Sequence, residues 1–151
     1  MTRQVFLTLA GQPATTEAAT QRIHAWLKVK GISSESLILD NGSGLSRNER
    51  ISAGQLRQLL LDAWKSTVMP EYMSSLPIAG VDGTLRKRFV DSIVYGRAHL
   101  KTGSLEGVRS FAGYVLDNRK QRWVVVFIIN DPKASAGNAA VDAFIEWVAA
   151  H

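Results

Sequence analysis

The segment that most constrains the fold is an almost wholly apolar run in the last third of the chain, Trp123-Val-Val-Val-Phe-Ile-Ile129. A short run rich in β-branched and aromatic residues predicts a β-strand. A strand without polar alternation is expected to be buried on both faces, so we expect this one at the centre of a sheet. Asn130-Asp131-Pro132 follows the run and ends it.

Two earlier segments of the last third are also typical of strands, Gly96–Lys101 and Ser110–Leu116. The polar stretch Asp117–Gln121 predicts a hairpin turn between the second strand and the third. A closing helix is predicted over Ala134–Ala150. We expect the inward side of that helix to be formed by Ala140, Phe144, Trp147 and Val148.

The first half of the chain predicts two helices. Thr15–Lys30 has apolar residues at helical spacing and Gly31 as a stop signal, and a second helix is predicted from Ser52 to about Ser66. Ser36–Asp40 predicts a short strand, and Pro70 is expected to end this part of the chain. The fold class is therefore α+β: two helices and loops, a three-stranded antiparallel meander, and a C-terminal helix. So small a sheet would be easier to understand if further strands came from elsewhere.

Composition excludes several classes of function. The chain has 151 residues, 46% of them hydrophobic, which fits one globular domain or part of one. It has no cysteine, so disulfides and thiolate metal sites are excluded. The net charge is +5, but the basic residues are scattered and the largest cluster is Arg86-Lys87-Arg88, so no nucleic acid is expected as a partner. No membrane span is expected and no convincing export signal is found.

No metal or cofactor is expected. His24, His99 and His151 lack the spacing and the neighbouring carboxylates of a metal site, and His24 is interpreted as a surface or hydrogen-bonded histidine. His99 alternates with Lys101 on the predicted strand, so we expect it near whatever Lys101 faces. The glycine-rich run Asn41-Gly-Ser-Gly44 lacks the Gly-Lys-Ser/Thr ending of a phosphate-binding loop.

The remaining candidate for chemistry is Lys101-Thr-Gly-Ser-Leu-Glu-Gly107. Lys-Thr-Gly is one of three motifs of penicillin-binding proteins and class A β-lactamases, together with Ser-x-x-Lys and Ser-Asp-Asn. Three residues recur by chance, and the alternative interpretation is a polar strand end with a turn. The context favours the motif, because the triplet lies at the end of a predicted strand and is followed by strand, strand and helix.

Further blocks occur with it in a fixed order. They are Asp40-Asn-Gly-Ser-Gly-Leu-Ser-Arg47, Leu76-Pro-Ile-Ala-Gly-Val-Asp-Gly-Thr-Leu85 and Phe111-Ala-Gly-Tyr114, the last after the Lys-Thr-Gly block. Together these blocks resemble the C-terminal part of the D-alanyl-D-alanine carboxypeptidase/endopeptidase family of the penicillin-binding protein 4 type (serine peptidase family S13). The resemblance covers nearly all of the chain and implies part of a penicillin-binding/β-lactamase-like transpeptidase fold.

The resemblance implies a serine acyl-enzyme mechanism on peptidoglycan stem peptides, which lie along the Lys-Thr-Gly strand as an added edge strand. It implies that Lys101 polarises the site and attracts the terminal carboxylate, and that Thr102 hydrogen-bonds this carboxylate. Gly103 would leave room for the substrate, and the Ser104 N–H would be one of two oxyanion-hole donors. Asp82 and Thr84 are expected to shape a loop.

Two substrate-binding residues follow from the same resemblance. Arg47 would reach the acidic side-chain end of the stem peptide's diamino acid, although a surface arginine that caps the next turn is an equal alternative. Glu106 stands where a neutral amide is expected in close relatives. A carboxylate there favours an ammonium group of the substrate over a carboxylate.

The nucleophile of the family is absent, because no serine in the sequence is followed by lysine three residues later. Ser46-Arg-Asn48 spells Ser-x-Asn, but by the resemblance that element lies upstream of Thr2. We therefore expect residues 1–151 to be a single C-terminal fragment of the catalytic domain of a periplasmic enzyme, inactive alone, whose full-length parent binds β-lactams. The alternatives are a non-catalytic module that binds peptidoglycan peptides and an unrelated α+β protein.

Overall fold

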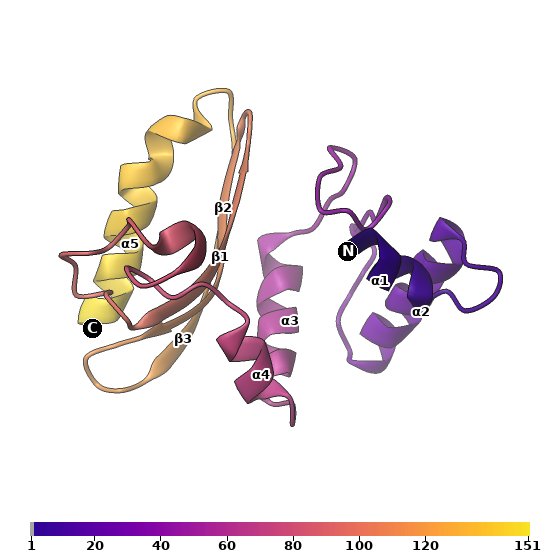
Figure 1. Ribbon diagram of the computed structural model, residues 1–151, viewed down its shortest axis with the longest axis horizontal. Coiled ribbons are helices and arrows are strands. Elements are labelled where there is room, and N and C mark those ends of the chain that lie inside the picture. Colours follow the sequence, from indigo (N-terminus) through magenta and orange to yellow (C-terminus); the bar gives the residue numbers. More distant parts are fainter. Residues whose placement is uncertain (1) are drawn as a thin grey trace. The chain divides into compact units, whose positions relative to one another are not determined.

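The computed structural model describes residues 2–151 (Figure 1). The chain forms two compact units, and the boundary between them falls within helix α3: one unit reaches Gln58 and the other begins at Leu59. Each unit has a hydrophobic core of its own.

The core of the first unit lies between helix α1 (Thr2–Thr8) and helix α2 (Thr16–Val29). It buries Phe6, Ala10 and Ala19. The hydroxyl of Thr15 accepts a hydrogen bond from the Ala18 backbone N–H at 3.1 Å and so caps α2. Gly31 follows the helix with a φ of +68°, a conformation in which glycine carries no steric penalty. The helix predicted over Thr15–Lys30 is confirmed.

The strand predicted over Ser36–Asp40 is wrong. Only Ile38 pairs, in an isolated antiparallel bridge with Arg50 whose two backbone hydrogen bonds measure 2.9 and 3.0 Å. The chain turns away at once, because Gly42 has a φ of +66° and lies directly against Phe6. A Cβ atom at Gly42 would lie 2.3 Å from the Cβ of Phe6, so only glycine fits in this turn.

Helix α3 (Ala53–Trp64) begins where the sequence predicts. Ser52 and Gln55 form a capping box: the Ser52 hydroxyl accepts from the Gln55 N–H at 3.1 Å, and the Gln55 side-chain oxygen accepts from the Ser52 N–H at 2.9 Å. The expectation that Pro70 ends this part of the chain is wrong. Pro70 lies in the first turn of helix α4 (Met69–Ser74), where a missing N–H costs the helix nothing.

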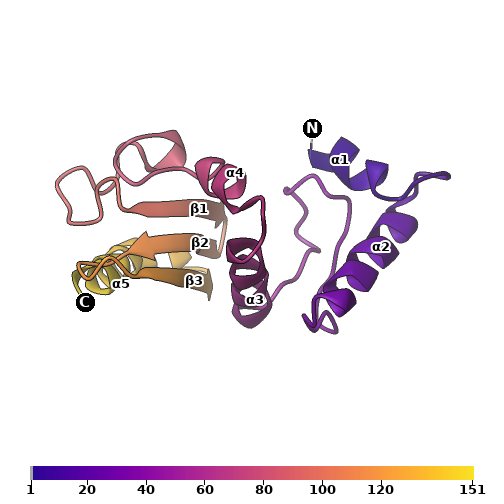
Figure 2. The ribbon, with the colours of Figure 1, turned by 90° about the horizontal axis from the view of Figure 1, so that it is seen from below.

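The sheet consists of β1 (Ala98–Leu105), β2 (Val108–Leu116) and β3 (Arg122–Asn130), all antiparallel in the order β1-β2-β3 (Figure 2). The predicted meander is confirmed, but the central position predicted for the apolar run is wrong. β2 is central and β3 lies at an edge, because short connections on both sides of β2 place its sequence neighbours on its two edges. Trp123 of β3 is 49% exposed.

A short 3₁₀ turn, η2 (Ala134–Gly137), leads into helix α5 (Asn138–Ala150), which covers one face of the sheet (Figure 1). Phe144 and Trp147, which we expected to face inward, are 38% and 57% exposed, and Ala140 is exposed as well. Phe144 instead stacks on Trp147 at 6.2 Å between ring centroids. The apolar face of α5 is therefore rotated from the predicted one, and its buried residues are Val141, Ile145, Val148 and Ala149.

The opposite face of the sheet is held by Tyr114 of β2. Its hydroxyl donates to the Leu60 carbonyl of α3 at 2.7 Å. Its ring lies 5.5 Å from the Trp64 ring and 6.5 Å from the Tyr72 ring of α4, measured between centroids. Burial, with a smaller contribution from Tyr72, raises the pKa of Tyr114 to about 12. The buried tyrosine thus stays neutral and remains a hydrogen-bond donor over the physiological pH range.

The hairpin between β2 and β3 is organised by the buried carboxylate of Asp117. It accepts hydrogen bonds from the Arg119 N–H at 2.9 Å, the Gln121 N–H at 2.7 Å and the Trp123 indole N–H at 2.8 Å. The bond from Trp123 is the largest cause that lowers the pKa of Asp117. The carboxylate is therefore satisfied as an anion, which confirms the hairpin predicted over Asp117–Gln121.

The outer edge of β3 predicts self-association. Asp131, just past the end of β3, donates its N–H back to Gly107, so alternation along the strand directs the backbone groups of Val124, Val126 and Ile128 outward. None of residues 2–151 pairs with that edge. An unpaired apolar edge is a template for a second strand, so we expect Val126→Lys to shift the chain toward monomer in sedimentation velocity.

Gln121→Lys adds the same charge outside the strand and is the matched control, which should leave the association unchanged. A wild-type chain that sediments as a monomer at all concentrations and unfolds in one sharp thermal transition would contradict this expectation.

Candidate functional site

Lys101-Thr-Gly-Ser104 lies inside β1, which continues to Leu105 rather than ending at Lys101 as predicted. One edge of β1 pairs with β2 along its whole length. The other edge is covered only at its start, where the Ala79 N–H donates to the Ala98 carbonyl and the Leu100 N–H donates to the Pro77 carbonyl, both at 2.9 Å. Beyond Leu100 no backbone of the described chain pairs with this edge. The predicted edge strand is confirmed.

Alternation along β1 identifies the groups that face this open edge. Backbone groups of Ala98 and Leu100 point away from β2, so those of Thr102 and Ser104 point away from it as well. The ammonium of Lys101 donates to the Thr102 carbonyl at 2.5 Å. The open edge therefore presents the N–H groups of Thr102 and Ser104, with a cation beside them.

Gly103 lies close to a side chain of β2 inside the sheet. It pairs with Ser110 of β2, and a Cβ atom at Gly103 would lie 2.3 Å from the Ser110 hydroxyl oxygen. Lys101, two residues earlier and on the same face, is exposed. A side chain at Gly103 would therefore require the Ser110 hydroxyl to rotate away.

Thr102 lies on the other face, and its hydroxyl is 3.0 Å from the hydroxyl of Thr84. Thr84 belongs to a single 3₁₀ turn, η1 (Gly83–Leu85). The expectation that this block shapes a loop is confirmed for Asp82, whose carboxylate accepts the Ile78 N–H at 2.7 Å. The contact between Thr84 and Thr102 could not be predicted from local spacing, because the two residues are 18 positions apart in different motifs.

The turn that follows carries Glu106, which is exposed. Gly107 has a φ of +73°, and the turn returns the chain directly into β2. Arg109 braces it from β2: its guanidinium donates to the carbonyls of Leu105 and Val108, both at 2.7 Å. Glu106 therefore lies at a fixed place at the end of β1, with its carboxylate toward solvent.

Arg47 belongs to the first unit, whereas Lys101, Thr102, Ser104 and Glu106 belong to the second. Arg47 is exposed, and its backbone carbonyl accepts a hydrogen bond from the Arg50 guanidinium at 2.6 Å.

The turn before Arg47 is closed by hydrogen bonds from side chains. The Ser46 hydroxyl donates to the Asp40 carboxylate, and the Ser43 N–H donates to the Asn41 side-chain oxygen at 2.9 Å. The guanidinium of Arg47 has no partner among the interactions of the described residues, so it is accessible to a carboxylate.

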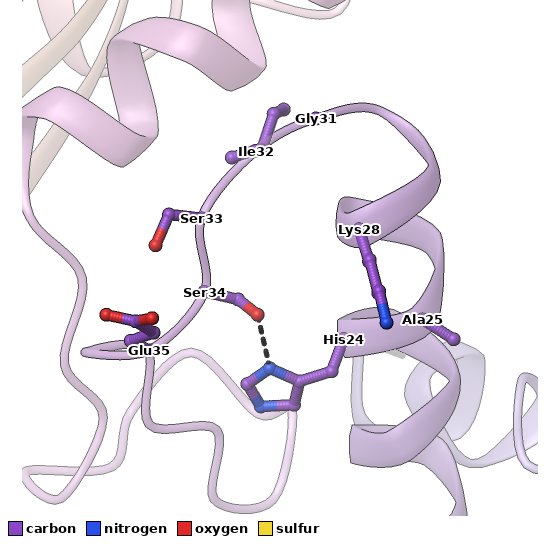
Figure 3. A pocket seen from close by; sticks show the side chains of 8 residues that line it. All are labelled: His24, Ala25, Lys28, Gly31, Ile32, Ser33, Ser34 and Glu35. Atoms are coloured by element: carbon purple, nitrogen blue, oxygen red, sulfur yellow. Dashed lines mark hydrogen bonds between the residues drawn. The ribbon is translucent and has the colours of Figure 1, made fainter.

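A surface pocket of about 580 Å³ lies in the first unit, beside the C-terminal half of α2 (Figure 3). His24 lines it, with its Nδ1 atom 2.8 Å from the Ser34 hydroxyl, as expected of a hydrogen-bonded histidine. Lys28 and Glu35 also line it. Within residues 2–151 there is no group of three side chains that could hold a metal ion.

His99 lies on the same face of β1 as Lys101 and is opposite Tyr114. Its Nδ1 atom is buried without a hydrogen-bond partner. Burial is the main cause that lowers the pKa of His99, the positive charge of Arg122 lowers it further, and a hydrogen bond with the Met73 backbone acts in the opposite direction. The imidazole is therefore neutral at the start of the strand that carries the Lys-Thr-Gly triplet.

The sheet with its open edge strand and with helices on both faces is matched by solved structures of penicillin-binding proteins. The crystal structure of penicillin binding protein 4 (dacB) from Haemophilus influenzae, complexed with a novel β-lactam, matches 99% of this chain with a TM-score of 0.84 and 27% identity. The family described as D-Ala-D-Ala carboxypeptidase 3 (S13) matches residues 1–151. The chain belongs to this family.

Two curated relatives are consistent with membership of this family. D-alanyl-D-alanine carboxypeptidase DacB of Haemophilus influenzae is 32% identical over 79% of this chain, and Carboxypeptidase DacB of Mycolicibacterium smegmatis is 34% identical over 88% of it. The chain spans 25% and 30% of the lengths of these relatives and 38% of the solved chain. Among the described helices, none combines the length and the apolar character that a membrane crossing needs.

The lowered pKa of His99 predicts a loss of stability in mild acid. Below the ordinary histidine pKa of 6.5 the unfolded chain binds a proton that the folded chain does not, so stability is complete above pH 6.5 and falls as the pH drops toward the folded pKa. We expect the free energy of unfolding in urea to decrease between pH 7.5 and pH 5.5.

His99→Gln should remove most of that decrease, because the side chain no longer titrates. His24→Gln is the control for a histidine with a partner and should keep it. The explanation is wrong if wild type and His99→Gln lose equal stability over this interval.

Proposed function

We propose that the chain forms part of the active site of a D-alanyl-D-alanine carboxypeptidase/endopeptidase that acts on peptidoglycan stem peptides. The observation that carries the proposal is the open edge of β1 at Thr102 and Ser104, with the Lys101 ammonium beside it, in a member of the S13 family. Relatives more than 30% identical that are named as carboxypeptidases support the reaction class.

In this proposal the stem peptide adds to β1 as a further strand. Backbone hydrogen bonds to Thr102 and Ser104 fix its register, and these are the two residues whose polar groups alternate toward the free edge. The C-terminal carboxylate of the peptide then takes the Lys101 ammonium from the Thr102 carbonyl, where it is held at 2.5 Å. A carboxylate is a stronger partner for an ammonium than a neutral carbonyl.

The Thr102 hydroxyl would add a hydrogen bond to that carboxylate. The N–H of Ser104 would be one of two donors to the oxyanion that forms during acyl transfer. Its direction toward the open edge supports this role, since a donor that pointed at β2 would already be paired.

Two exposed charges would select the peptide's side chain. Arg47 would bind a carboxylate at the end of the diamino acid, because a guanidinium presents two parallel donors to it. Glu106 at the end of β1 favours an ammonium group instead.

The family mechanism uses a serine nucleophile from Ser-x-x-Lys, which this sequence lacks. We propose that the chain is the C-terminal piece of a periplasmic catalytic domain and that it does not react on its own, whereas the whole enzyme is acylated by β-lactams.

Incubation with a penicillin tests this directly. The chain contains no serine in the reactive motif, so we expect its intact mass to remain unchanged after hours with excess penicillin. A catalytically competent S13 enzyme run in parallel provides the positive control. A stoichiometric adduct on this chain would identify a reactive serine in it and contradict the proposal.

Peptide binding tests the open edge without requiring catalysis. Lys101→Met removes the ammonium and keeps the length of the side chain, so we expect the Kd for an acetylated peptide ending in D-Ala-D-Ala to rise about tenfold. The Kd for the C-terminal amide of the same peptide should change little. Isothermal titration calorimetry measures both, and Lys133→Met is the matched control at an exposed site. Equal affinity of wild type for acid and amide would contradict the assigned role.

A second candidate is a non-catalytic module that binds peptidoglycan peptides. It is supported by the open edge of β1, whose N–H groups at Thr102 and Ser104 could bind a peptide without a nucleophile. An in-frame Ser-x-x-Lys ahead of Thr2 in the gene supports the carboxypeptidase, and a start of translation at residue 1 supports the module.

A further inference from the structure

Thr84 and Thr102 form a pair of hydroxyls on one side of the open strand, 3.0 Å apart. Thr102 is partly buried on β1 and Thr84 is exposed on η1. No other hydrogen bond of the Thr102 side chain occurs within the described part of the chain. The position of the Thr102 hydroxyl therefore depends on its own rotamer and on Thr84.

The turn that carries Thr84 is fixed on several sides. Leu85, the next residue, is completely buried in the core of the second unit. Its carbonyl accepts the Gly80 N–H at 3.1 Å and its N–H donates to the Asp82 carbonyl at 3.2 Å. Gly83 has a φ of +53°, and a Cβ atom there would lie 3.0 Å from the Cβ of Pro77. The hydroxyl of Thr84 is thus held at the edge by rigid backbone.

A hydroxyl has one proton to donate and two lone pairs that accept. In the free chain Thr102 donates to Thr84, which leaves the Thr102 oxygen without a proton for a ligand. When Thr84 donates to Thr102 instead, the Thr102 proton is released toward the open edge. The same two oxygen positions serve both arrangements, because only the two protons rotate.

We propose that Thr84 is a positioning residue for carboxylate recognition, an inference that rests on the proposed function of the open edge. Its hydroxyl holds the Thr102 oxygen at the edge in the free chain. When the peptide's C-terminal carboxylate arrives, Thr84 changes from acceptor to donor and Thr102 donates its proton to the carboxylate. Thr84 touches no ligand and acts through Thr102.

Thr84→Val and Thr84→Ser separate this role from simple packing. Valine keeps the shape and the β-branch but has no hydroxyl, whereas serine keeps the hydroxyl and loses a methyl group. We expect Thr84→Val to weaken binding of an acetylated peptide ending in D-Ala-D-Ala about fivefold, since the Thr102 hydroxyl loses the partner that holds its oxygen at the edge. Thr84→Ser should stay within about twofold of wild type.

Two further measurements make the test specific. The C-terminal amide of the peptide has no carboxylate, so its Kd should be the same for wild type and Thr84→Val. In a Thr102→Val background, Thr84→Val should have no further effect on the acid, because the pair has already been broken. Thermal unfolding of each variant checks that the fold is retained.

Three outcomes overturn the inference: equal weakening of acid and amide by Thr84→Val, no weakening of either, or an effect that persists in the Thr102→Val background. In each of these the wild-type preference for acid over amide still stands, and so does the proposed function. A wild-type chain without that preference overturns the proposed function and the inference together.

Discussion

Two backbone hydrogen bonds from Pro77 and Ala79 determine where the sheet is closed and where it is open. They cover the outer edge of β1 at Ala98 and Leu100, and Leu100, the last covered residue, directly precedes Lys101. The Lys-Thr-Gly triplet is therefore the first part of the strand that a second chain can reach. Because alternation along β1 is fixed by the same bonds, the residues that offer their N–H groups to that chain are fixed as well.

The covering segment owes its position to the core and to one ion pair. Leu85 and Phe111 are buried together with α5. Arg88 forms an ion pair with Asp142 of α5, with Nη2 2.6 Å from one carboxylate oxygen, and its guanidinium carbon lies 4.6 Å from the centre of the Phe111 ring. Both charged side chains are partly buried, where such a pair is screened less by water than at an open surface. Residues 77–88 are thereby tied to the C-terminal helix.

Local signals in the sequence were sufficient to predict most helices and strands. They were not sufficient to predict which elements lie beside one another. The helices that begin near Thr15 and Ser52 and the hairpin turn over Asp117–Gln121 depend on residues close in sequence, and all three were predicted. The position of β3 at the edge of the sheet was not predicted. Its apolar composition indicates that the strand is buried, but it does not indicate the order of the strands. Likewise the motif located Lys101, but the contact between Thr102 and Thr84 comes from tertiary packing, which leaves no trace in local spacing.

The Asp117 hairpin also has a consequence for the order in which the sheet forms. Its farthest hydrogen bond, to Trp123, spans six residues, whereas the Thr84–Thr102 contact spans 18. Loops that are short close with less loss of entropy, so contacts near in sequence form early in folding. β1, β2 and β3 are joined by the short turns at Glu106–Gly107 and Asp117–Gln121, so the whole three-stranded meander should form early. The strand with the Lys-Thr-Gly triplet would thus be in place before Thr84, whose contact with Thr102 spans 18 residues, packs beside it.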